Sequence, residues 1–422
     1  MNDRAALDLL LEHGPLSRPR VGELTGLSKP TASQLLARLE AAGLVHATGA
    51  SEGRPGPNAR LYAVRPAAGH AAGLDVAPHR VRAAVADITG RTVGAYELPT
   101  PGRGADGPER VVRQVTGALD GALEAAGLAR ADVRRLVVAT PGAFDPTTGR
   151  LRYATHLPGW HSPTILEDLA AALPMPVEYE NDVNLVALAE QRLGAARGRR
   201  DFVLLWNETG LGAALVLGGR LHRGWTGGAG EVGFLPVPGA ALARGVASTG
   251  SGGFQELAGA QAVLELAHDL GIEHTEHTEH AAIAADTRHA ANLERTPHAA
   301  NPPHTGTSPS PSPAEAAAAL LAHAASHATG PQRTLLTTYA TRLATGLAAL
   351  VSVLDPELVV LSGAVLTAGG EVLRAQVQAE LAELAASRPH LVISEVREHP
   401  VLRGALESAL TAARDEVFDT AR

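Results

Sequence analysis

Hydrogen-bonding and basic side chains gather on one side of a short helical segment near the start of the chain. Such groups suit the major groove of DNA, where amides pair with adenine edges and hydroxyls reach bases or phosphates. Gln34 is expected to read a base, and Thr31 and Ser33 to contact bases or phosphates. Lys29 and Arg38 flank them and would neutralise phosphate charge. The pattern therefore predicts a DNA-reading helix.

Two short helices joined by a tight turn position these side chains. Gly26 suits the end of the first helix, and Ser28 suits the cap of the second. On the side opposite the polar groups, an apolar arc at helical spacing predicts the core face of the second helix: Ala32, Leu35, Leu36 and Leu39. Gly and Pro between residues 46 and 61 predict a β-wing with Arg54 at its tip, where it would contact the minor groove or a phosphate. The alternative is a small structural bundle that binds no DNA.

Net charge distinguishes residues 1–66, called the head, from the rest of the chain. Residues 1–66 hold eight Lys and Arg and six Asp and Glu, which gives a net charge of +2. Because the net charge of the whole chain is −8, the remaining residues carry −10. Only the head suits a polyanion, and its excess of positive charge is small. Tight binding would therefore need two heads on a palindromic site, so at least a homodimer is expected.

Composition limits the classes of protein to consider. With 422 residues and 45% apolar residues, the chain is long enough for several packed domains. It has no cysteine, which excludes disulfides, thiol nucleophiles and thiolate metal sites. No apolar run approaches the ~20 residues that span a bilayer, and the first residues lack a signal-peptide pattern. A cytoplasmic protein with no membrane contact is expected.

Strands and helices alternate after residue 71, first as a β-meander and then as an α/β arrangement. In such domains, polar groups where a strand runs into a helix are where ligands bind. The segment PVEYEND followed by an apolar helical pattern places Asn181 and Asp182 at such a junction. The fold class predicted for this part is α/β.

Six motifs follow one another along the rest of the chain, called the body: ATPGAFDPTTG, LPGW, ENDVN, GGAGEVGF, GSGGFQE and LDPELVVLSG. With these motifs in this order, the body resembles the ROK family, which contains bacterial sugar kinases and sugar-responsive repressors. The resemblance covers nearly the whole chain, and the winged helix in front is typical of the repressor branch. It implies a winged helix-turn-helix followed by a two-lobed, actin-like fold with sugar in the cleft between the lobes.

The same resemblance assigns candidate ligand residues. Carried over position by position, Asn181 and Asp182 would contact sugar hydroxyls, with Asp182 at the place of the kinases' general base. Glu231 and Glu256 match further sugar-binding carboxylates, and Gly142 lies in the sugar-side loop. Ionised carboxylates suit polyols because each accepts several hydroxyl donors.

Two departures from the family pattern concern phosphate. Asp75 is followed by Val-Ala-Pro-His rather than by a Gly-rich turn, and Pro78 supplies no N–H to a phosphate. Glu208 stands in the second phosphate turn where the kinases generally have glycine, and a carboxylate beside a triphosphate is repulsive. The chain is therefore expected to have no catalytic residues, to need no nucleotide or other cofactor, and not to be an enzyme.

The family's zinc loop is also changed. The positions of its four ligands are held here by residues that cannot bind zinc well: Phe234, Ala247, Thr249 and Phe254. No metal is expected, and Phe234 and Phe254 are predicted to pack where the ion would lie. Because the family's histidine also contacts sugar, and because His156 stands where Asn is usual, the ligand is expected to differ from glucose-type sugars or to be absent.

A His- and Pro-rich stretch at about 270–315 interrupts the second lobe. His274, His277 and His280 would share one side of a helix and suggest a metal sensor, but a solvated low-complexity insertion is the preferred interpretation. Three domains are expected along the chain: the winged helix at 1–66; lobe 1 at 70–185, completed by 395–422; and lobe 2 at 186–394.

Three functions remain in contention. The preferred one is a sequence-specific transcriptional regulator, a repressor of carbohydrate uptake or metabolism, that binds an operator and takes a sugar or sugar phosphate as effector. The second is a sugar kinase with an appended DNA-binding domain. The third is a body that binds no ligand and only dimerises or binds another protein. Ligand binding separates the first from the third, and ATP turnover would favour the second.

Overall fold

A computed structural model describes most of the chain: residues 2–50, 59–100, 107–145, 148, 150–152, 157, 159–243, 252–272 and 311–419. Several predictions concern residues outside these ranges: Arg54, His156, Ala247, Thr249 and most of the His-rich stretch. The described residues form two compact units: residues 1–192, 225–227 and 398–422 in the first, and 193–224 and 228–397 in the second.

The first unit begins with three helices and a three-stranded sheet in the order β1-β3-β2. Its elements are α1 (Asn2–His13), β1 (Leu16–Ser17), α2 (Arg18–Thr25), α3 (Lys29–Ala41), β2 (Val45–Ala50) and β3 (Arg60–Val64). Gly26 ends α2 with φ of 70°, and the Ser28 hydroxyl caps α3 by accepting from the Thr31 N–H. The apolar arc of α3 is buried as predicted. These elements form a winged helix, in which α3 holds the place of the reading helix.

The rest of the first unit is an α/β lobe around the sheet β10-β7-β4-β5-β6. Strands β4, β5 and β6 form the predicted antiparallel meander, and β7 and β10 extend it in parallel. The bounds are η1 (Pro66–Ala68), β4 (His70–Ala77), β5 (Arg80–Asp87), β6 (Thr92–Pro99), α4 (Pro108–Ala126), η2 (Arg130–Asp132), β7 (Val133–Thr140), β8 (Ala143–Asp145), β9 (Arg150–Arg152), α5 (Ile165–Ala172), β10 (Val177–Asn181), α6 (Asp182–Leu193) and α14 (Pro400–Asp419).

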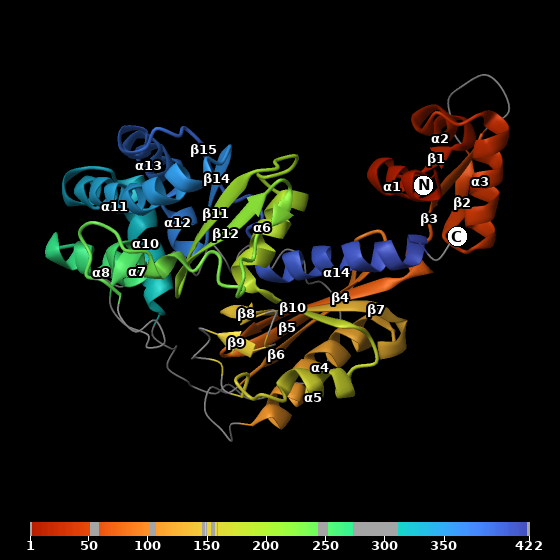
Figure 1. Cartoon of the computed structure of the whole chain (residues 1–422), viewed down its shortest axis with the longest axis horizontal. Coiled ribbons are helices and arrows are strands. Elements are labelled where there is room, and N and C mark those ends of the chain that lie inside the picture. The colour runs from red at the N-terminus through yellow and green to blue at the C-terminus, as the bar shows by residue number, and fades with distance from the viewer. Residues whose placement is uncertain are drawn as a thin grey trace, which may run out of the picture. The chain divides into compact units, whose positions relative to one another are not determined.

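Helices cover both faces of this sheet, with α4 and α5 on one face and α14 on the other (Figure 1). Two glycines let α14 lie very close to its neighbours. A Cβ on Gly404 would lie 1.9 Å from the Leu185 carbonyl oxygen of α6, and one on Gly73 of β4 would lie 2.8 Å from the Leu406 nitrogen. The C-terminal helix is therefore packed against both the central strand and α6 at backbone distance.

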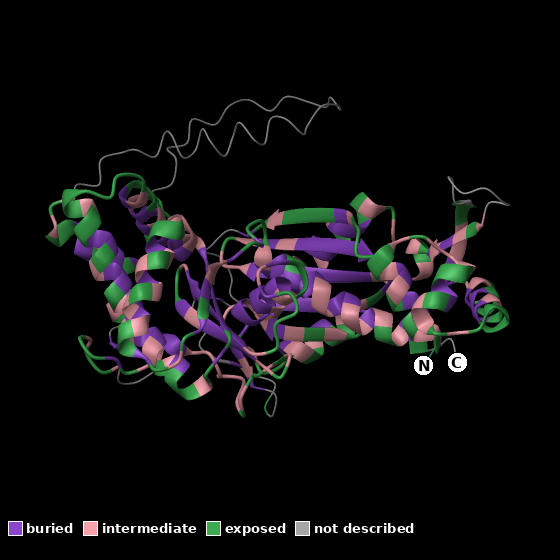
Figure 2. Ribbon diagram, turned by 90° about the horizontal axis from the view of Figure 1, so that it is seen from above, coloured by how far each residue is buried: buried purple, intermediate pink, exposed green. Residues whose placement is uncertain are grey.

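The second unit is built on the sheet β13-β12-β11-β14-β15, in which β11, β14 and β15 are parallel. The bounds are β11 (Phe202–Asn207), β12 (Leu211–Leu217), β13 (Arg220–Leu221), η3 (Val232–Phe234), α7 (Gly253–Ala258), α8 (Ala260–Asp269), α10 (Pro313–Ser326), α11 (Gly330–Leu354), β14 (Leu358–Ser362), α12 (Ala364–Ala368), α13 (Gly370–Leu384) and β15 (His390–Ile393). Buried residues concentrate along the strands and on the inner sides of the helices (Figure 2). Helices α10 and α11 follow each other closely along the chain.

Candidate functional site

Helix α3 presents the predicted reading residues away from its buried arc. Lys29, Thr31 and Gln34 are exposed, and Ser33 is half-buried. The Thr31 hydroxyl lies 2.8 Å from the Ser28 hydroxyl, so it is held next to the start of the helix. The structure thus brings four of the six predicted DNA contacts onto one surface, at the N-terminal part of a helix, as major-groove reading requires.

Arg38 is also exposed on α3, but it already has an anionic partner. Its Nε lies 3.1 Å from the Asp3 carboxylate of α1, and a second nitrogen donates to the same carboxylate. A phosphate contact by Arg38 would compete with Asp3. No local sequence pattern indicates this pairing, because the two residues are 35 positions apart.

Two arginines that were not singled out from the sequence lie at the ring of Tyr62 on β3. Arg18, at the start of α2, and Arg60, at the start of β3, lie 5.2 and 5.4 Å from the ring centre of the buried Tyr62. Arg60 also pairs with Glu40 at 3.0 Å. The sequence signal that could have indicated this contact is Arg60 two residues before Tyr62, since an aromatic ring can hold a guanidinium in place.

Within the first unit, the junction of β10 and α6 brings Gly142, Asn181 and Asp182 together. The Asn181 amide donates to the Gly142 carbonyl at 3.1 Å and to Asp182 Oδ1 at 3.0 Å. Gly142 has φ of 84°, a conformation that glycine adopts without strain. The three predicted ligand residues of this unit therefore form one hydrogen-bonded group.

Further hydrogen bonds fix the side chains at this junction. Asn181 Oδ1 accepts from the Asn184 N–H at 3.0 Å, and Asp182 Oδ1 accepts from the Val183 N–H at 2.8 Å. The Asn184 amide donates to the buried Glu180 carboxylate at 2.9 Å. These bonds satisfy the first N–H groups of α6 and fix both side chains, which is the arrangement a preorganised binding site needs.

The remaining two carboxylates lie in the second unit and differ from each other. Glu231 is half-buried, and burial raises the pKa of its carboxyl above the usual range. Gly230, which precedes Glu231, has φ of 99°, and a Cβ on it would lie 2.0 Å from the Ala213 carbonyl oxygen. The close contact between these two backbone segments therefore requires glycine at position 230. Glu256 on α7 is exposed and accepts from the Ala241 N–H at 3.3 Å. It therefore holds a loop in addition to any role in binding.

The hairpin after Asp75 is closed by protein groups. Thr100 binds the turn through its N–H to the His79 carbonyl at 2.8 Å and its hydroxyl to the Pro78 carbonyl at 3.2 Å. Arg80 Nη2 lies 3.8 Å from Asp75 Oδ2. Burial raises the pKa of the Asp75 carboxyl, against the opposing effect of the nearby arginine charge. An arginine of the chain itself thus lies beside the aspartate where the family kinases have a phosphate turn.

The positions that match the family's zinc loop are partly described. Phe254 is fully buried in the core of the second unit, and a Cβ on Gly346 of α11 would lie 2.3 Å from its ring. Phe234 is half-buried at the end of η3. The expected packing of these two rings against each other stays a prediction. Within the described ranges, no group of three or more His, Cys, Asp or Glu side chains is placed to hold a metal.

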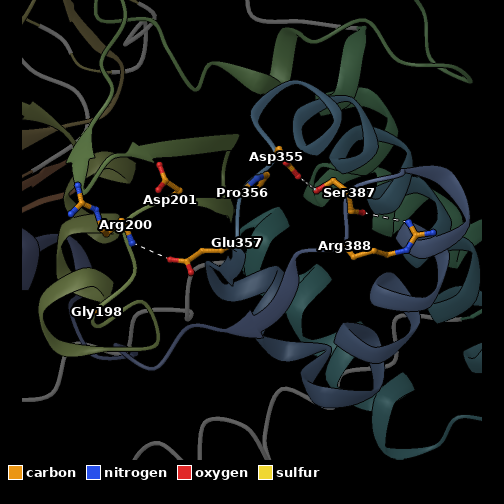
Figure 3. A pocket seen from close by; sticks show the side chains of 8 residues that line it. All are labelled: Gly198, Arg200, Asp201, Asp355, Pro356, Glu357, Ser387 and Arg388. Atoms are coloured by element: carbon orange, nitrogen blue, oxygen red, sulfur yellow. Dashed lines mark hydrogen bonds between the residues drawn. The ribbon is translucent and has the colours of Figure 1, made fainter.

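A surface pocket of about 530 Å³ lies elsewhere in the second unit (Figure 3). Its lining residues precede β11, β14 and β15, so it lies at the amino ends of these strands. The lining groups bind one another, as in the 3.0 Å bond from the Arg200 N–H to Glu357 and the 2.7 Å bond from Ser387 to Asp355. Since ligands of α/β domains bind at the carboxyl ends of strands, this pocket is not the candidate site.

These observations define a class: a winged-helix domain followed by two α/β units with the actin-like sugar-kinase fold. Comparison with known families is specific. The ROK family model matches residues 71–412, and the MarR family model matches residues 3–54. The chain belongs to the ROK family and carries a MarR-type winged helix at its N-terminal side.

Known relatives include kinases and regulators. The chain is 29% identical over 165 residues to a glucokinase of Halalkalibacterium halodurans, covering 39% of this chain and 49% of that protein. It is 24% identical over 243 residues to the DNA-binding transcriptional dual regulator NagC of Escherichia coli, covering 56% and 57%. The chain spans about half the length of the curated relatives it matches.

Two solved structures share the fold. A ROK family transcriptional regulator, a homologue of the E. coli MLC protein, has a TM-score of 0.70 at 18% identity, covering 100% of this chain and 98% of that one. A ROK glucokinase of Streptomyces griseus, in complex with glucose and AMPPNP, has a TM-score of 0.58 at 23% identity, covering 81% and 100%. In the described part of the chain, no helix is long and apolar enough to cross a membrane.

Proposed function

We propose that this protein is a transcriptional regulator that represses carbohydrate genes and responds to a sugar or sugar phosphate. The observation that carries the proposal is the exposed polar face of α3 on a winged helix, joined in one chain to a ROK body. Lys29, Thr31, Ser33 and Gln34 would contact an operator, with two heads of a homodimer on a palindromic site. Because the target is DNA, the protein would act in the cytoplasm.

The proposed effector site uses the hydrogen-bonded group at the start of α6. Asn181 and Asp182 would contact sugar hydroxyls, with Gly142 contributing its loop, and Glu231 and Glu256 are the further residues proposed as sugar ligands. The bonds that fix Asn181 and Asp182 before a ligand arrives support this role, since preorganised acceptors lose little entropy on binding.

Phosphoryl transfer is not part of the proposal. Asp75 is already beside Arg80, and the turn that follows contains Pro78, which has no N–H to offer a phosphate. Glu208 adds a carboxylate to the second turn, where it would repel a nucleotide triphosphate. Binding without turnover is what an effector site requires, and a steady ATP-dependent phosphorylation of sugar by the purified protein would favour the kinase instead.

A route from effector to DNA runs through α14. At its N-terminal half, Gly404 contacts Leu185 of α6, the helix that begins with Asp182. Near its other end, Asp415 pairs with Arg4 of α1 at 2.6 Å, and the same guanidinium lies 5.4 Å from the Phe418 ring centre. A shift of α6 on ligand binding would thus move the helix that holds the head.

The first experiment is a thermal-shift screen of the full chain against mono- and disaccharides and their phosphates, followed by operator binding with and without each hit. A ligand of the native state raises the melting temperature by mass action. The shift should vanish in the double variant Asp182→Ala, Glu231→Ala. It should persist in the matched surface control Glu109→Ala, Glu265→Ala, whose carboxylates are exposed on α4 and α8. No hit across the panel, with operator binding intact, would favour a body that only dimerises or binds a protein.

A further inference from the structure

Two histidines at the end of α10 form a feature that the proposed function does not use. His323 and His327 are four residues apart, so they lie on the same side of the helix, and both are exposed. Their rings are stacked, with centroids 4.5 Å apart and planes 26° apart. Two imidazoles at this spacing are what a helix offers when it binds a transition metal through two histidines.

The backbone indicates which nitrogen of His327 is available to a metal. Nδ1 of His327 lies 3.2 Å from the His323 carbonyl oxygen. A carbonyl only accepts, so Nδ1 carries the proton in this bond and the lone pair of the neutral ring is on Nε2. A ligating histidine that donates its other ring N–H to a backbone carbonyl is the usual outer arrangement at metal sites, because it orients the ring and raises its basicity.

The position in the helix adds a favourable field. His323 lies in the last turn of α10 and His327 follows as its C-cap, where the helix dipole is negative and unsatisfied carbonyl groups gather. Positive charge is stabilised there. Within the described ranges, no third His, Cys, Asp or Glu completes a cluster, so water would fill the other coordination positions.

We propose that His323 and His327 form a surface site for a divalent transition metal of the kind that prefers imidazole, namely Ni²⁺, Cu²⁺ or Zn²⁺. Magnesium and calcium are excluded as occupants, since they select oxygen ligands. Rotation of the two exposed rings would bring both Nε2 atoms to the ~2.0–2.1 Å that such ions require. The site is separate from the family's zinc loop, whose matching positions lie between residues 234 and 254, and it does not depend on the proposed effector role.

Binding at this site has a structural consequence. A metal held by His323 and His327 links the last turn of α10 to the residue that ends it, and so fixes the connection to α11, which begins at Gly330. Because α10 packs against α8 and α12 in the core of the second unit, occupancy stabilises the native state of that unit.

The test must resolve individual histidines, since nine of the chain's 18 histidines lie between residues 268 and 327. The full chain is modified with diethyl pyrocarbonate, with and without Ni²⁺, Cu²⁺ or Zn²⁺, and each histidine is followed by peptide mass spectrometry. The expected result is metal-dependent protection of His323 and His327 together, reversed by a chelator. His268 is the matched control, because it is exposed in the last turn of α8 and has no histidine four residues away.

Variants make the result decisive. In His327→Gln, protection of His323 should require at least about tenfold more metal, because the second ligand no longer acts at high effective concentration. His268→Gln should leave the protection of both residues unchanged. Equal protection of His268 and His323, or protection of His323 that is unaltered in His327→Gln, would show single-histidine binding and overturn the proposal.

Discussion

The contact between Arg4 and α14 offers the sharpest test of the proposed coupling between effector binding and operator binding. Arg4 pairs with Asp415 at 2.6 Å and with Asp8 at 3.1 Å, and it lies over the Phe418 ring. The side chains of Arg4 and Asp415 are 34% and 57% exposed, so water screens the pair. An exposed ion pair contributes at most about 1 kcal/mol, and the cation–π contact about 0.5–1 kcal/mol.

The total of roughly 1–2 kcal/mol corresponds to about a 5–30-fold change in an equilibrium constant. Allosteric couplings are typically about 1–3 kcal/mol, so losing this contact would remove a large part of such a coupling. Arg4→Ala is therefore expected to reduce the factor by which sugar changes operator affinity by about fivefold or more. Sugar binding itself, read from the thermal shift, should remain.

The assay is fluorescence anisotropy of a labelled operator, measured with and without the effector for each variant. Asp415→Ala should match Arg4→Ala, and the exchange Arg4→Asp with Asp415→Arg should restore part of the response. Arg134→Ala is the matched control, since Arg134 pairs with the neighbouring Glu416 on α14 at 3.9 Å without contacting the head. A full sugar response in Arg4→Ala, together with its loss in Asp182→Ala, would refute the route through α14.

Three further expectations follow from the same contacts. Replacing Thr31, Ser33 and Gln34 by Ala should lower affinity for the specific operator by at least about 100-fold while leaving weak, salt-sensitive binding to any DNA, and unchanged specificity would refute the role of α3. Gly404→Ala should destabilise the protein by about 3 kcal/mol, seen as a clear fall in melting temperature, because the new Cβ would meet the Leu185 carbonyl at 1.9 Å. Glu231→Gln should raise the melting temperature near neutral pH: burial raises the folded-state pKa, so the carboxyl's contribution to stability is present at low pH and is lost as pH rises through that pKa. The gain should shrink towards about pH 4, and a gain independent of pH would contradict this cause.

Local chemistry predicted much of the fold. Gly26 and Ser28 placed the end of α2 and the cap of α3, because a left-handed glycine and a capping hydroxyl act within a few residues. The meander and the junction at Asn181 followed from strand and helix periodicity.

Pairings between distant residues were beyond the sequence. Arg38 was expected to face phosphate, yet it binds Asp3 of α1, a helix that was not among the predicted elements. Arg4 and Asp415 are 411 positions apart. Which of many surface charges meet depends on how whole elements pack, and each such pair contributes little energy, so no local pattern encodes it.

Two aspartates of the first lobe bear on the proposal that the body binds an effector without transferring phosphate. Asp75 and Asp182 both lie where strands of one sheet end, on β4 and just after β10. Asp75 is buried beside Arg80, a cation of the chain itself, so a nucleotide's metal and phosphates would have to displace that partner. Asp182 accepts from the Val183 N–H and from the Asn181 amide, and these bonds orient its carboxylate. In the proposed function, Asp182 is an oriented acceptor for sugar hydroxyls and Asp75 is held in an internal ion pair, an arrangement that would favour binding over phosphoryl transfer.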